Sequence, residues 1–292
     1  MKILLMGKNG QLGWELQRSL AFVGELVALN RHSVPHTGDL GDLGDLTALT
    51  ETVRACLPDV IVNAAAYTAV DQAEGDAHMA PAALAREASI LGASLVHFST
   101  DYVFDGNGER PWSESDTPAP LNAYGQIKLE GEQAIQAACP RHLIFRTSWV
   151  YAARGNNFAK TMLCLAQESE TLTVVDDQWG APTGADLLAD VAAHCIRQVP
   201  QCPGDVGLYH LSASGQTNWF GYAKYVLAKA FDSQIATKIV AKNVLAVPSG
   251  SFVTSAARPL NSRLDTRRLQ AVFGLSLPPW QNWVDRLLAE IH

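Results

Sequence analysis

Short apolar runs that alternate with amphipathic stretches are the feature that most constrains the fold of this chain. The runs lie at residues 2–6, 25–30, 59–66, 94–100 and 142–151. The segments between them have helical periodicity or an Ala-rich composition. Continuous apolar runs are typical of parallel strands buried on both faces, and parallel strands need crossover helices. The chain therefore predicts an α/β fold built on a doubly wound parallel sheet.

A glycine-rich loop, GKNGQLG, follows the first apolar run and opens the first helical stretch. In its GxxGxxG pattern Gly7 permits a tight turn, Gly10 lets backbone N–H groups approach a pyrophosphate, and Gly13 permits close helix–sheet packing. A plain strand-to-helix turn is the alternative. Its place directly after a buried strand favours dinucleotide binding, by Gly7, Gly10, Gln11 and Leu12.

The alternation loosens beyond about residue 156, where helical stretches at 157–169 and 187–199 alternate with short strands. We expect residues 1–155 to form a Rossmann-like dinucleotide-binding domain, to which later segments can return. We expect residues 156–292 to form mainly a smaller C-terminal α/β lobe that binds the substrate.

The end of the second apolar run indicates the type of dinucleotide. An acidic residue there would bind the ribose 2′-hydroxyl of NAD, but this chain has Asn30 and then Arg31. A guanidinium suits phosphate oxygens, which favours NADP(H) over NADH; a solvated loop charge is the other interpretation of Arg31. The repeat GDLGDLGDL at residues 38–46 offers two pairs for contact with adenine. These are Asp39 with Leu40 and Asp42 with Leu43, of which counting back from the next helix favours the second.

Composition excludes several classes of protein. A formal net charge of −7 argues against a general nucleic-acid or anionic-membrane binder. No apolar run is long enough to span a bilayer, and the N-terminal run breaks at Gly7, unlike a signal peptide. The five scattered cysteines include no CxxC pair, which indicates reduced thiols. We therefore expect a cytoplasmic protein whose partner is a small molecule.

Three polar motifs follow strands or open a helix. Residues 63–66 end the third apolar run, residues 99–101 end the fourth, and Tyr124 and Lys128 open the next helical stretch. Ligands of doubly wound sheets lie at the carboxyl ends of the strands, so all three motifs should line one crevice. The spacing of four places Tyr124 and Lys128 on one helix face.

The chemistry of these residues suits reduction of a ketone, which needs a hydride and a proton for the developing alkoxide. A free tyrosine has a pKa of about 10. The ammonium of Lys128 should lower the pKa of Tyr124 and make it a better acid at working pH. Lys128 can also hold ribose hydroxyls, and Thr100 can hydrogen-bond the substrate oxygen. Two polar residues on a helix surface are the alternative interpretation.

Several motifs together resemble the extended short-chain dehydrogenase/reductase superfamily and, within it, the dTDP-4-dehydrorhamnose reductase family. They are GKNGQLGWEL, PDVIVNAAAYTAVDQAE, STDYVFDG, PLNAYGQIKLEGE, FRTSWVYAARGNNFAKTM, DDQWGAPTGADLLAD and RPLNSRLD. They cover nearly the whole chain in this order. The resemblance implies reduction of the 4-keto group of dTDP-4-dehydro-L-rhamnose by NADPH or NADH, in a pathway that supplies rhamnose to lipopolysaccharide or another glycoside.

The resemblance also implies site residues. The catalytic set would be Thr100, Tyr124 and Lys128, with Tyr124 as proton donor. The residues implied to touch the cofactor elsewhere are Asn30, Arg31, Asp42, Leu43, Ala64, Ala65, Ala66, Tyr67, Tyr124 and Lys128. Those implied around the sugar are Thr68, Val70, Tyr102 and Trp149, and those at the deoxynucleotide end are Asn157, Gln178, Thr183 and Arg258. A diphosphate needs a cation, which agrees with Arg258; core packing is the alternative for Trp149.

Some members of the family form dimers around Mg²⁺, so the resemblance allows a homodimer. The carboxylates that could supply the metal ligands are Glu15, Asp186 and Asp190. The two aspartates are four residues apart and share a helix face. Asp186 is shorter than the glutamate of the family pattern, and solvated helix charges are the alternative.

The chain departs from the family pattern after Ala80, where a short segment before Pro81 is absent. Pro81 suits this run only if it begins a new helix. We expect weak order around residues 75–85.

Two other functions remain as alternatives. One is a catalytically silent NADP-binding regulatory subunit, as in the methionine adenosyltransferase β subunit, against which the intact Thr100, Tyr124 and Lys128 argue. The other is a reductase or epimerase of a different nucleotide sugar. A dehydratase is disfavoured, because Asp101 is followed by Tyr102 and not by a glutamate.

Overall fold

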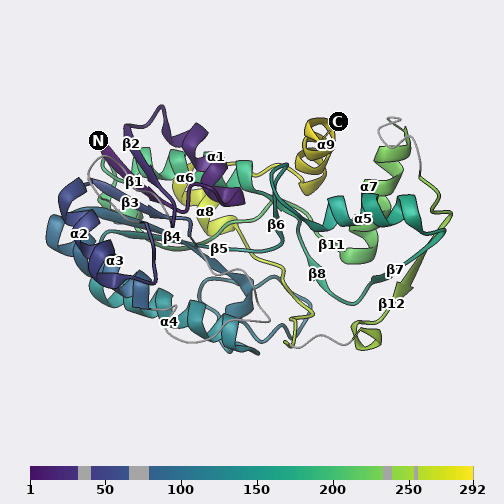
Figure 1. Cartoon of the computed structure of the whole chain (residues 1–292). Coiled ribbons are helices and arrows are strands. Elements are labelled where there is room, and N and C mark those ends of the chain that lie inside the picture. Colours follow the sequence, from purple (N-terminus) through teal and green to yellow (C-terminus); the bar gives the residue numbers. More distant parts are fainter. Residues whose placement is uncertain (32–40, 66–78, 233–238, 253–255, 292) are drawn as a thin grey trace.

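A six-stranded parallel sheet forms the centre of the larger part of the molecule (Figure 1). The computed structural model describes residues 1–31, 41–65, 79–232, 239–252 and 256–291. The strands run in the order β10-β5-β4-β3-β1-β2, and every neighbouring pair is parallel. Their bounds are β1 Lys2–Met6, β2 Glu25–Leu29, β3 Val60–Asn63, β4 Ser94–Thr100, β5 His142–Thr147 and β10 Gly207–His210. The predicted α/β fold class is confirmed.

Both faces of this sheet are covered, which explains why its strands are apolar throughout. Ile3 and Leu5 of β1 face one core, whereas Leu4 and Met6 face the other. The first core includes side chains from α1 (Gln11–Leu20), α6 (Ala185–Gln198) and α8 (Arg267–Phe273). The second includes side chains from α2 (Leu46–Cys56), α3 (Met79–Leu91) and α4 (Ala123–Ala138).

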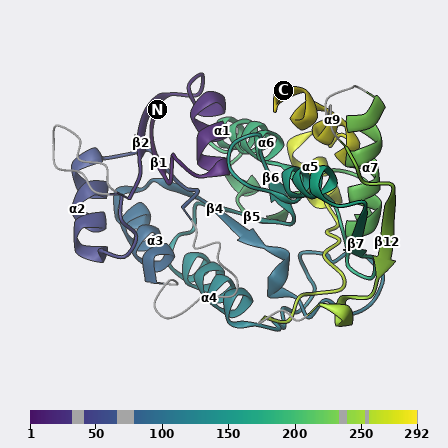
Figure 2. The same cartoon turned by 45° about the vertical axis from the view of Figure 1, so that its right-hand side comes forward.

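A smaller group of elements lies beyond the carboxyl ends of the strands (Figures 1 and 2). It contains α5 (Phe158–Glu168), α7 (Trp219–Asp232) and the parallel pair β7 (Thr171–Val175) and β12 (Asn243–Val247). Two short strand pairs connect it to the rest. They are β6 (Val150–Tyr151) with β9 (Thr183–Gly184) and β8 (Trp179–Gly180) with β11 (Thr217–Asn218). The last helix, α9 (Trp280–Glu290), packs against α7 and β9.

The second half of the chain also contributes to the main sheet. Strand β10 pairs with β5 at one edge, and α6 packs along α1. The chain therefore crosses between the two parts more than once.

Pro81 lies in the first turn of α3, a position that tolerates a residue without a backbone N–H. Residues 79–85 belong to this helix, so the expectation of weak order is wrong for them, and residues 75–78 lie outside the described residues. Among the described residues, no helix combines the length and the apolar character needed to cross a membrane.

Candidate active site

The glycine loop after β1 requires glycine at two of its three positions. Gly7 has a φ of +85°, and a Cβ there would lie 2.6 Å from the backbone nitrogen of Ala65. A Cβ on Gly13 would lie 2.0 Å from the carbonyl oxygen of Gly7. By contrast, a Cβ on Gly10 would meet only that oxygen, at 3.4 Å. The loop thus packs closely against the sheet and is open at Gly10, which suits a pyrophosphate at the start of α1.

The loop is tied to the segment that precedes α5. The Gln11 side chain donates hydrogen bonds to the carbonyls of Arg154 (3.2 Å) and Asn156 (3.0 Å), and Leu12 packs against the core. Gln11 therefore links the predicted cofactor loop to the smaller part of the molecule.

Arg31 and Asp42 lie together beyond the end of β2. Arg31 Nε is 3.2 Å from Asp42 Oδ2, and the arginine side chain is 70% exposed. Such an exposed pair contributes about 0–1 kcal/mol to stability, so little free energy would be lost if the guanidinium left Asp42 to bind a phosphate. Leu43 packs partly against the second core. The other predicted pair, Asp39 and Leu40, lies outside the described residues.

Thr100 and Tyr124 meet at the carboxyl end of β4. Thr100 caps the short helix η2 (Asp101–Val103): its hydroxyl accepts a hydrogen bond from Tyr102 N (3.2 Å) and donates one to Asp101 Oδ1 (3.1 Å). Tyr124 lies in the first turn of α4, capped by the Asn122 side chain. The side chain of Thr100 favours the phenolate of Tyr124 and so lowers the pKa of this tyrosine.

The electrostatics of Tyr124 differ from the prediction. Burial and the nearby charge of Asp101 raise its pKa to about 12, against the opposing effect of Thr100. Lys128 Nζ instead donates to the carbonyl of Phe98 at 3.0 Å, and burial lowers the pKa of this lysine to about 8. The expected lowering of the Tyr124 pKa by Lys128 is therefore corrected, because desolvation and a neighbouring carboxylate dominate.

A buried ion pair holds the helix that carries Tyr124 and Lys128. Glu132 follows at the same spacing of four and accepts bonds from Arg146 of β5 at 3.0, 3.2 and 2.6 Å. Both side chains are nearly inaccessible, at 1% for Glu132 and 4% for Arg146. The charge of Glu132 also raises the pKa of Lys128 against the effect of burial. An arginine within the otherwise apolar run at 142–147 was the signal in the sequence for this pair.

A histidine lies beneath Lys128. His97 of β4 is 2% exposed, its Nδ1 is 3.1 Å from Asn63 Nδ2, and its Nε2 has no hydrogen-bond partner among the described residues. Burial, and then the charge of Lys128, place the pKa of His97 well below its usual value. His97 is therefore neutral, and the lysine is the local cation. The signal in the sequence for a buried histidine was its place in the apolar run at 94–100.

Two residues predicted to bind substrate adjoin Tyr124. The Tyr102 ring meets that of Tyr124 edge-on, with centroids 5.6 Å apart. Burial is the main cause of the raised pKa of Tyr102, and the charge of Arg258 opposes this rise. The structure thus brings Tyr102 and Arg258 to the same place as Tyr124, although Arg258 is remote in the sequence.

Trp149 has an unusual backbone conformation and is held on both faces. Its φ is +50°, which is rare for a bulky residue and is found at functional sites. Its ring stacks on Trp219 with centroids 3.7 Å apart, and a Cβ on Gly180 would lie 2.7 Å from the ring. With both faces covered, Trp149 can offer a ligand only its edge. Trp219, which the sequence analysis did not single out, is the residue that aligns it.

Three other predicted substrate residues make structural contacts. The Asn157 side chain caps α5 and donates to the carbonyl of Ala152 at 2.7 Å. Gln178 accepts a hydrogen bond from the indole of Trp219 at 3.1 Å. Thr183 has no exposed surface, and its hydroxyl donates to a neighbouring carbonyl. Because Thr183 is fully enclosed, its contacts support the fold and not a ligand.

Four predicted residues cannot be placed. Ala66, Tyr67, Thr68 and Val70 lie outside the described residues. Ala64 and Ala65 are described and lie directly beside the glycine loop, where Ala64 N donates to the carbonyl of Met6 at 3.1 Å.

The predicted metal ligands do not form one cluster within the chain. Glu15, Asp186 and Glu290 line one small cavity, and Asp186 is 3.2 Å from the guanidinium of Arg286. Asp190 instead pairs with Arg18, 2.8 Å away. Among the described residues, no group of three His, Cys, Asp or Glu side chains is arranged to hold a metal. The geometry therefore does not support Mg²⁺ binding by one chain; the homodimer stays a prediction.

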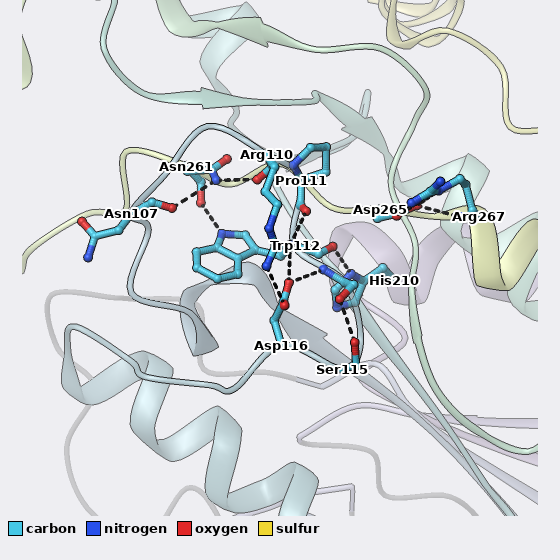
Figure 3. Close-up of polar contacts among 11 residues, drawn as sticks. Asn107, Arg110, Pro111, Trp112, Ser115, Asp116, His210, Asn261, Asp265 and Arg267 are labelled. Carbon is cyan, nitrogen blue, oxygen red and sulfur yellow. Dashed lines mark hydrogen bonds and ion pairs between the residues drawn. The ribbon is translucent and has the colours of Figure 1, made fainter.

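The loop between Thr100 and Tyr124 is anchored to two other segments and by an ion pair of its own (Figure 3). Trp112 donates its indole N–H to the carbonyl of Asn261, and its own carbonyl lies 2.9 Å from His210 Nδ1. The Asn261 side chain donates to the carbonyl of Arg110 at 2.8 Å. Arg110 in turn pairs with Asp116 through two bonds of 2.7 Å. These contacts hold the loop against β10 and the 256–265 segment.

Comparison with known proteins agrees with this architecture. The family model described as RmlD substrate binding domain matches residues 1–292. The chain is 53% identical over 298 residues to the dTDP-4-dehydrorhamnose reductase of Salmonella typhimurium, covering 100% of this chain and 98% of that protein.

Two solved structures are similar over nearly their full length. The dTDP-4-dehydrorhamnose reductase of Clostridium acetobutylicum has a TM-score of 0.85 at 33% identity. The Bacillus anthracis enzyme of that name, solved in complex with NADP, has a TM-score of 0.85 at 32% identity. In both comparisons 99% of each chain is covered.

Proposed function

The chain belongs to the RmlD substrate binding domain family, and from this premise we propose that it reduces the 4-keto group of dTDP-4-dehydro-L-rhamnose with NADPH. The observation that supports the proposal is the place of Tyr124 beside the turn that follows Thr100. The ring of Tyr124 meets that of Tyr102 edge-on, with centroids 5.6 Å apart, and the Thr100 hydroxyl accepts a hydrogen bond from Tyr102 N. The relatives that share the full length of the chain bear the name of this activity. A pure binding protein would have no use for a proton donor at that place.

Each of the three polar residues has a distinct role in this reaction. Bound NADPH would supply the hydride. Thr100 hydrogen-bonds the carbonyl oxygen and stabilises the charge that develops on it. Tyr124 Oη then gives its proton to that oxygen. The raised pKa of Tyr124 keeps the phenol protonated at neutral pH, so it is ready to act as the acid.

Lys128 serves the cofactor and the local charge. Its pKa of about 8 leaves most of the ammonium charged at pH 7, within reach of the cofactor ribose hydroxyls if it leaves the carbonyl of Phe98.

The loop after β1 and the region beyond β2 support a dinucleotide with a 2′-phosphate. Gly10 is open where a pyrophosphate would approach the N-terminus of α1. Arg31 is exposed and its ion pair with Asp42 is weak, so it can turn to a phosphate. Tyr102 and Arg258 are placed to bind the substrate beside Tyr124, with Arg258 as a cation for its diphosphate.

The test is turnover of NADPH with dTDP-4-dehydro-L-rhamnose, followed by the loss of NADPH absorbance and by identification of dTDP-L-rhamnose. We expect turnover with this substrate to exceed that with other 4-keto nucleotide sugars. Tight NADPH binding without oxidation on any sugar of the panel would refute the activity and leave a binding role. Faster turnover of a different sugar would refute the substrate.

A further inference from the structure

Residues 152–156, between β6 and α5, have every one of their backbone carbonyls held by a side chain, and we call this segment the strap. Gln11 donates to its third and fifth carbonyls at 3.2 and 3.0 Å. Lys160 Nζ donates to the second and to the fourth, the latter at 3.0 Å. Asn157 Nδ2 donates to the first at 2.7 Å. In chain order these carbonyls belong to Ala152, Ala153, Arg154, Gly155 and Asn156.

The two side chains that hold alternate carbonyls come from different parts of the molecule. Gln11 is the first residue of α1 and directly follows Gly10, where the glycine loop is open. Lys160 belongs to α5 in the smaller part. The guanidinium of Arg154 also lies over the ring of Trp14 of α1, 4.3 Å from its centroid. The strap is thereby attached to the predicted cofactor loop on one side and to the smaller part on the other.

These hydrogen bonds fix the position of the strap and are not required by burial. Arg154, Gly155 and Asn156 are exposed, so water could satisfy their carbonyls. Gly155 has a φ of +77°, and a Cβ there would lie 3.4 Å from Gln11 Nε2. The backbone therefore takes a conformation that favours glycine where it passes the Gln11 side chain.

The strap also borders the predicted substrate side. It directly follows β6, which begins at the residue after Trp149. A pyrophosphate bound by backbone N–H groups at the start of α1 would fix Gln11, the residue that holds the strap. We propose that Gln11 and Lys160 are positioning residues through which a bound cofactor strengthens the binding of the sugar nucleotide. This inference rests on the function proposed above.

The path between the two sites suits such a coupling because it is short and contiguous. It runs from the backbone of Gln11 through its side chain to the strap, then along the chain to Trp149 and through Lys160 to α5. Chains of hydrogen-bonded and packed groups of this kind carry coupling between sites. Once the cofactor has fixed the strap, the sugar nucleotide no longer has to order it and so binds more tightly.

The test is a calorimetric titration of dTDP into the full chain, with and without saturating NADP⁺. For the wild type we expect NADP⁺ to tighten dTDP binding about fivefold or more, as is usual for coupled sites. Gln11→Met keeps the backbone N–H groups of the loop but removes both hydrogen bonds to the strap. In this variant NADP⁺ should still bind, but its effect on dTDP affinity should disappear. Equal tightening in the variant and the wild type, or no tightening in the wild type, would overturn the proposal.

Gln17→Met is the matched control. Gln17 lies in the same helix and also donates to two backbone carbonyls, those of Lys8 at 2.9 Å and Gly13 at 3.3 Å, neither of which belongs to the strap. We expect this variant to keep the effect of NADP⁺ on dTDP affinity. A purely structural role for Gln11 would lower the melting temperature of Gln11→Met but leave the effect of NADP⁺ as in the control. Loss of the effect in both variants would also contradict the assignment to the strap.

Lys160 tests the strap from the other side. Lys160→Met removes two hydrogen bonds to the strap without changing any residue of the glycine loop, and the effect of NADP⁺ on dTDP affinity should again disappear. Lys160→Arg keeps a cation that can donate to both carbonyls and should preserve the effect. If Lys160→Met retains the full effect, the strap does not connect the two sites and the proposal is wrong.

These titrations separate this inference from the proposed function, because they measure binding and need no turnover. Absent turnover of dTDP-4-dehydro-L-rhamnose by the wild type would refute the proposed function, while the titrations would still decide the role of the strap. Normal turnover, with the same effect of NADP⁺ in the wild type and in Gln11→Met, would refute only the role of the strap.

Discussion

Tyr124 shows how little of a residue's chemistry follows from its spacing to a neighbour. The interval of four to Lys128 predicts a shared helix face, but the burial of the phenol and the charge of Asp101 determine the direction of its pKa shift. The raised pKa keeps Tyr124 protonated at neutral pH, as its proposed role of proton donor requires.

Removing the phenolic hydroxyl should therefore abolish most of the activity and spare the fold. We expect Tyr124→Phe to lower kcat by about 10²–10⁴-fold, the usual contribution of general acid catalysis. Thermal unfolding and NADPH binding should stay close to wild type. Near-normal turnover in this variant would remove Tyr124 from the role of proton donor.

Arg31 is the residue on which we expect the choice of cofactor to depend. Its only described ion pair is an exposed one with Asp42, so its replacement should have little effect on stability. We expect Arg31→Ala to weaken NADPH binding by about tenfold to a hundredfold, from the loss of charged hydrogen bonds to the 2′-phosphate. NADH, measured by the same titration, is the control and should be nearly unaffected. Equal weakening of both cofactors would contradict the assignment.

At the scale of an element, α4 is held by a stripe of three side chains spaced four residues apart. Tyr124 and Lys128 face the site, and Glu132 is held by Arg146 of β5. The helix that carries the two proposed catalytic side chains is therefore fixed to a central strand of the sheet.

Removing one charge of this ion pair should reduce stability, because the other charge then stays buried without its partner. We expect Glu132→Gln to reduce the free energy of unfolding by about 3–5 kcal/mol in denaturant titrations. The variant should also lower the pKa of Lys128, since Glu132 raises it. The control is Glu130→Gln on the same helix, whose side chain accepts a bond from Gln126 at the surface and should change stability by less than about 0.5 kcal/mol. Equal stability of the two variants would contradict the argument.

At the scale of the whole molecule, the site depends on segments from both halves of the chain. Trp112 of the loop before α4 contacts His210 of β10 and Asn261 of the 256–265 segment (Figure 3). Ser262 and Arg258 of that segment reach Asp101 and Tyr102. The return of the chain over the carboxyl ends of the strands thus completes the site.

The buried His210 should make this assembly sensitive to acid. Burial and the charge of Arg146 lower its pKa from 6.5 to about 3, so between these values the unfolded chain binds a proton that the folded protein excludes. Stability from His210 is present above about pH 6.5 and falls as pH falls, by about 1.4 kcal/mol per unit. In unfolding experiments between pH 6 and 4, we expect the free energy of unfolding of His210→Asn to depend less on pH than that of the wild type, by about this amount. Measurements near pH 8 give the change in stability that the substitution causes at every pH. An unchanged pH dependence of the free energy of unfolding would contradict the prediction.

The local features of the site were accessible from the sequence. The apolar runs became β1, β3, β4 and β5 because parallel strands covered on both faces need apolar side chains throughout. Gly7 and Gly13 were recognisable because a tight turn and close helix packing leave no room for a Cβ. These properties depend on near neighbours, so a pattern of a few residues contains them.

Only the tertiary structure decided which distant residues act on that local framework. The pattern of apolar residues does not show which distant segments come into contact. Such contacts join Arg146 to Glu132, Trp219 to Trp149, and Ser262 to Asp101. The same contacts changed the expected chemistry, since they and the burial they create determine the pKa values of Tyr124, Lys128 and Asp101. The sequence by itself determined the fold class and indicated Tyr124 as the candidate proton donor. Desolvation and long-range charge, which exist only once the chain has folded, decided the direction in which the pKa of this phenol shifts.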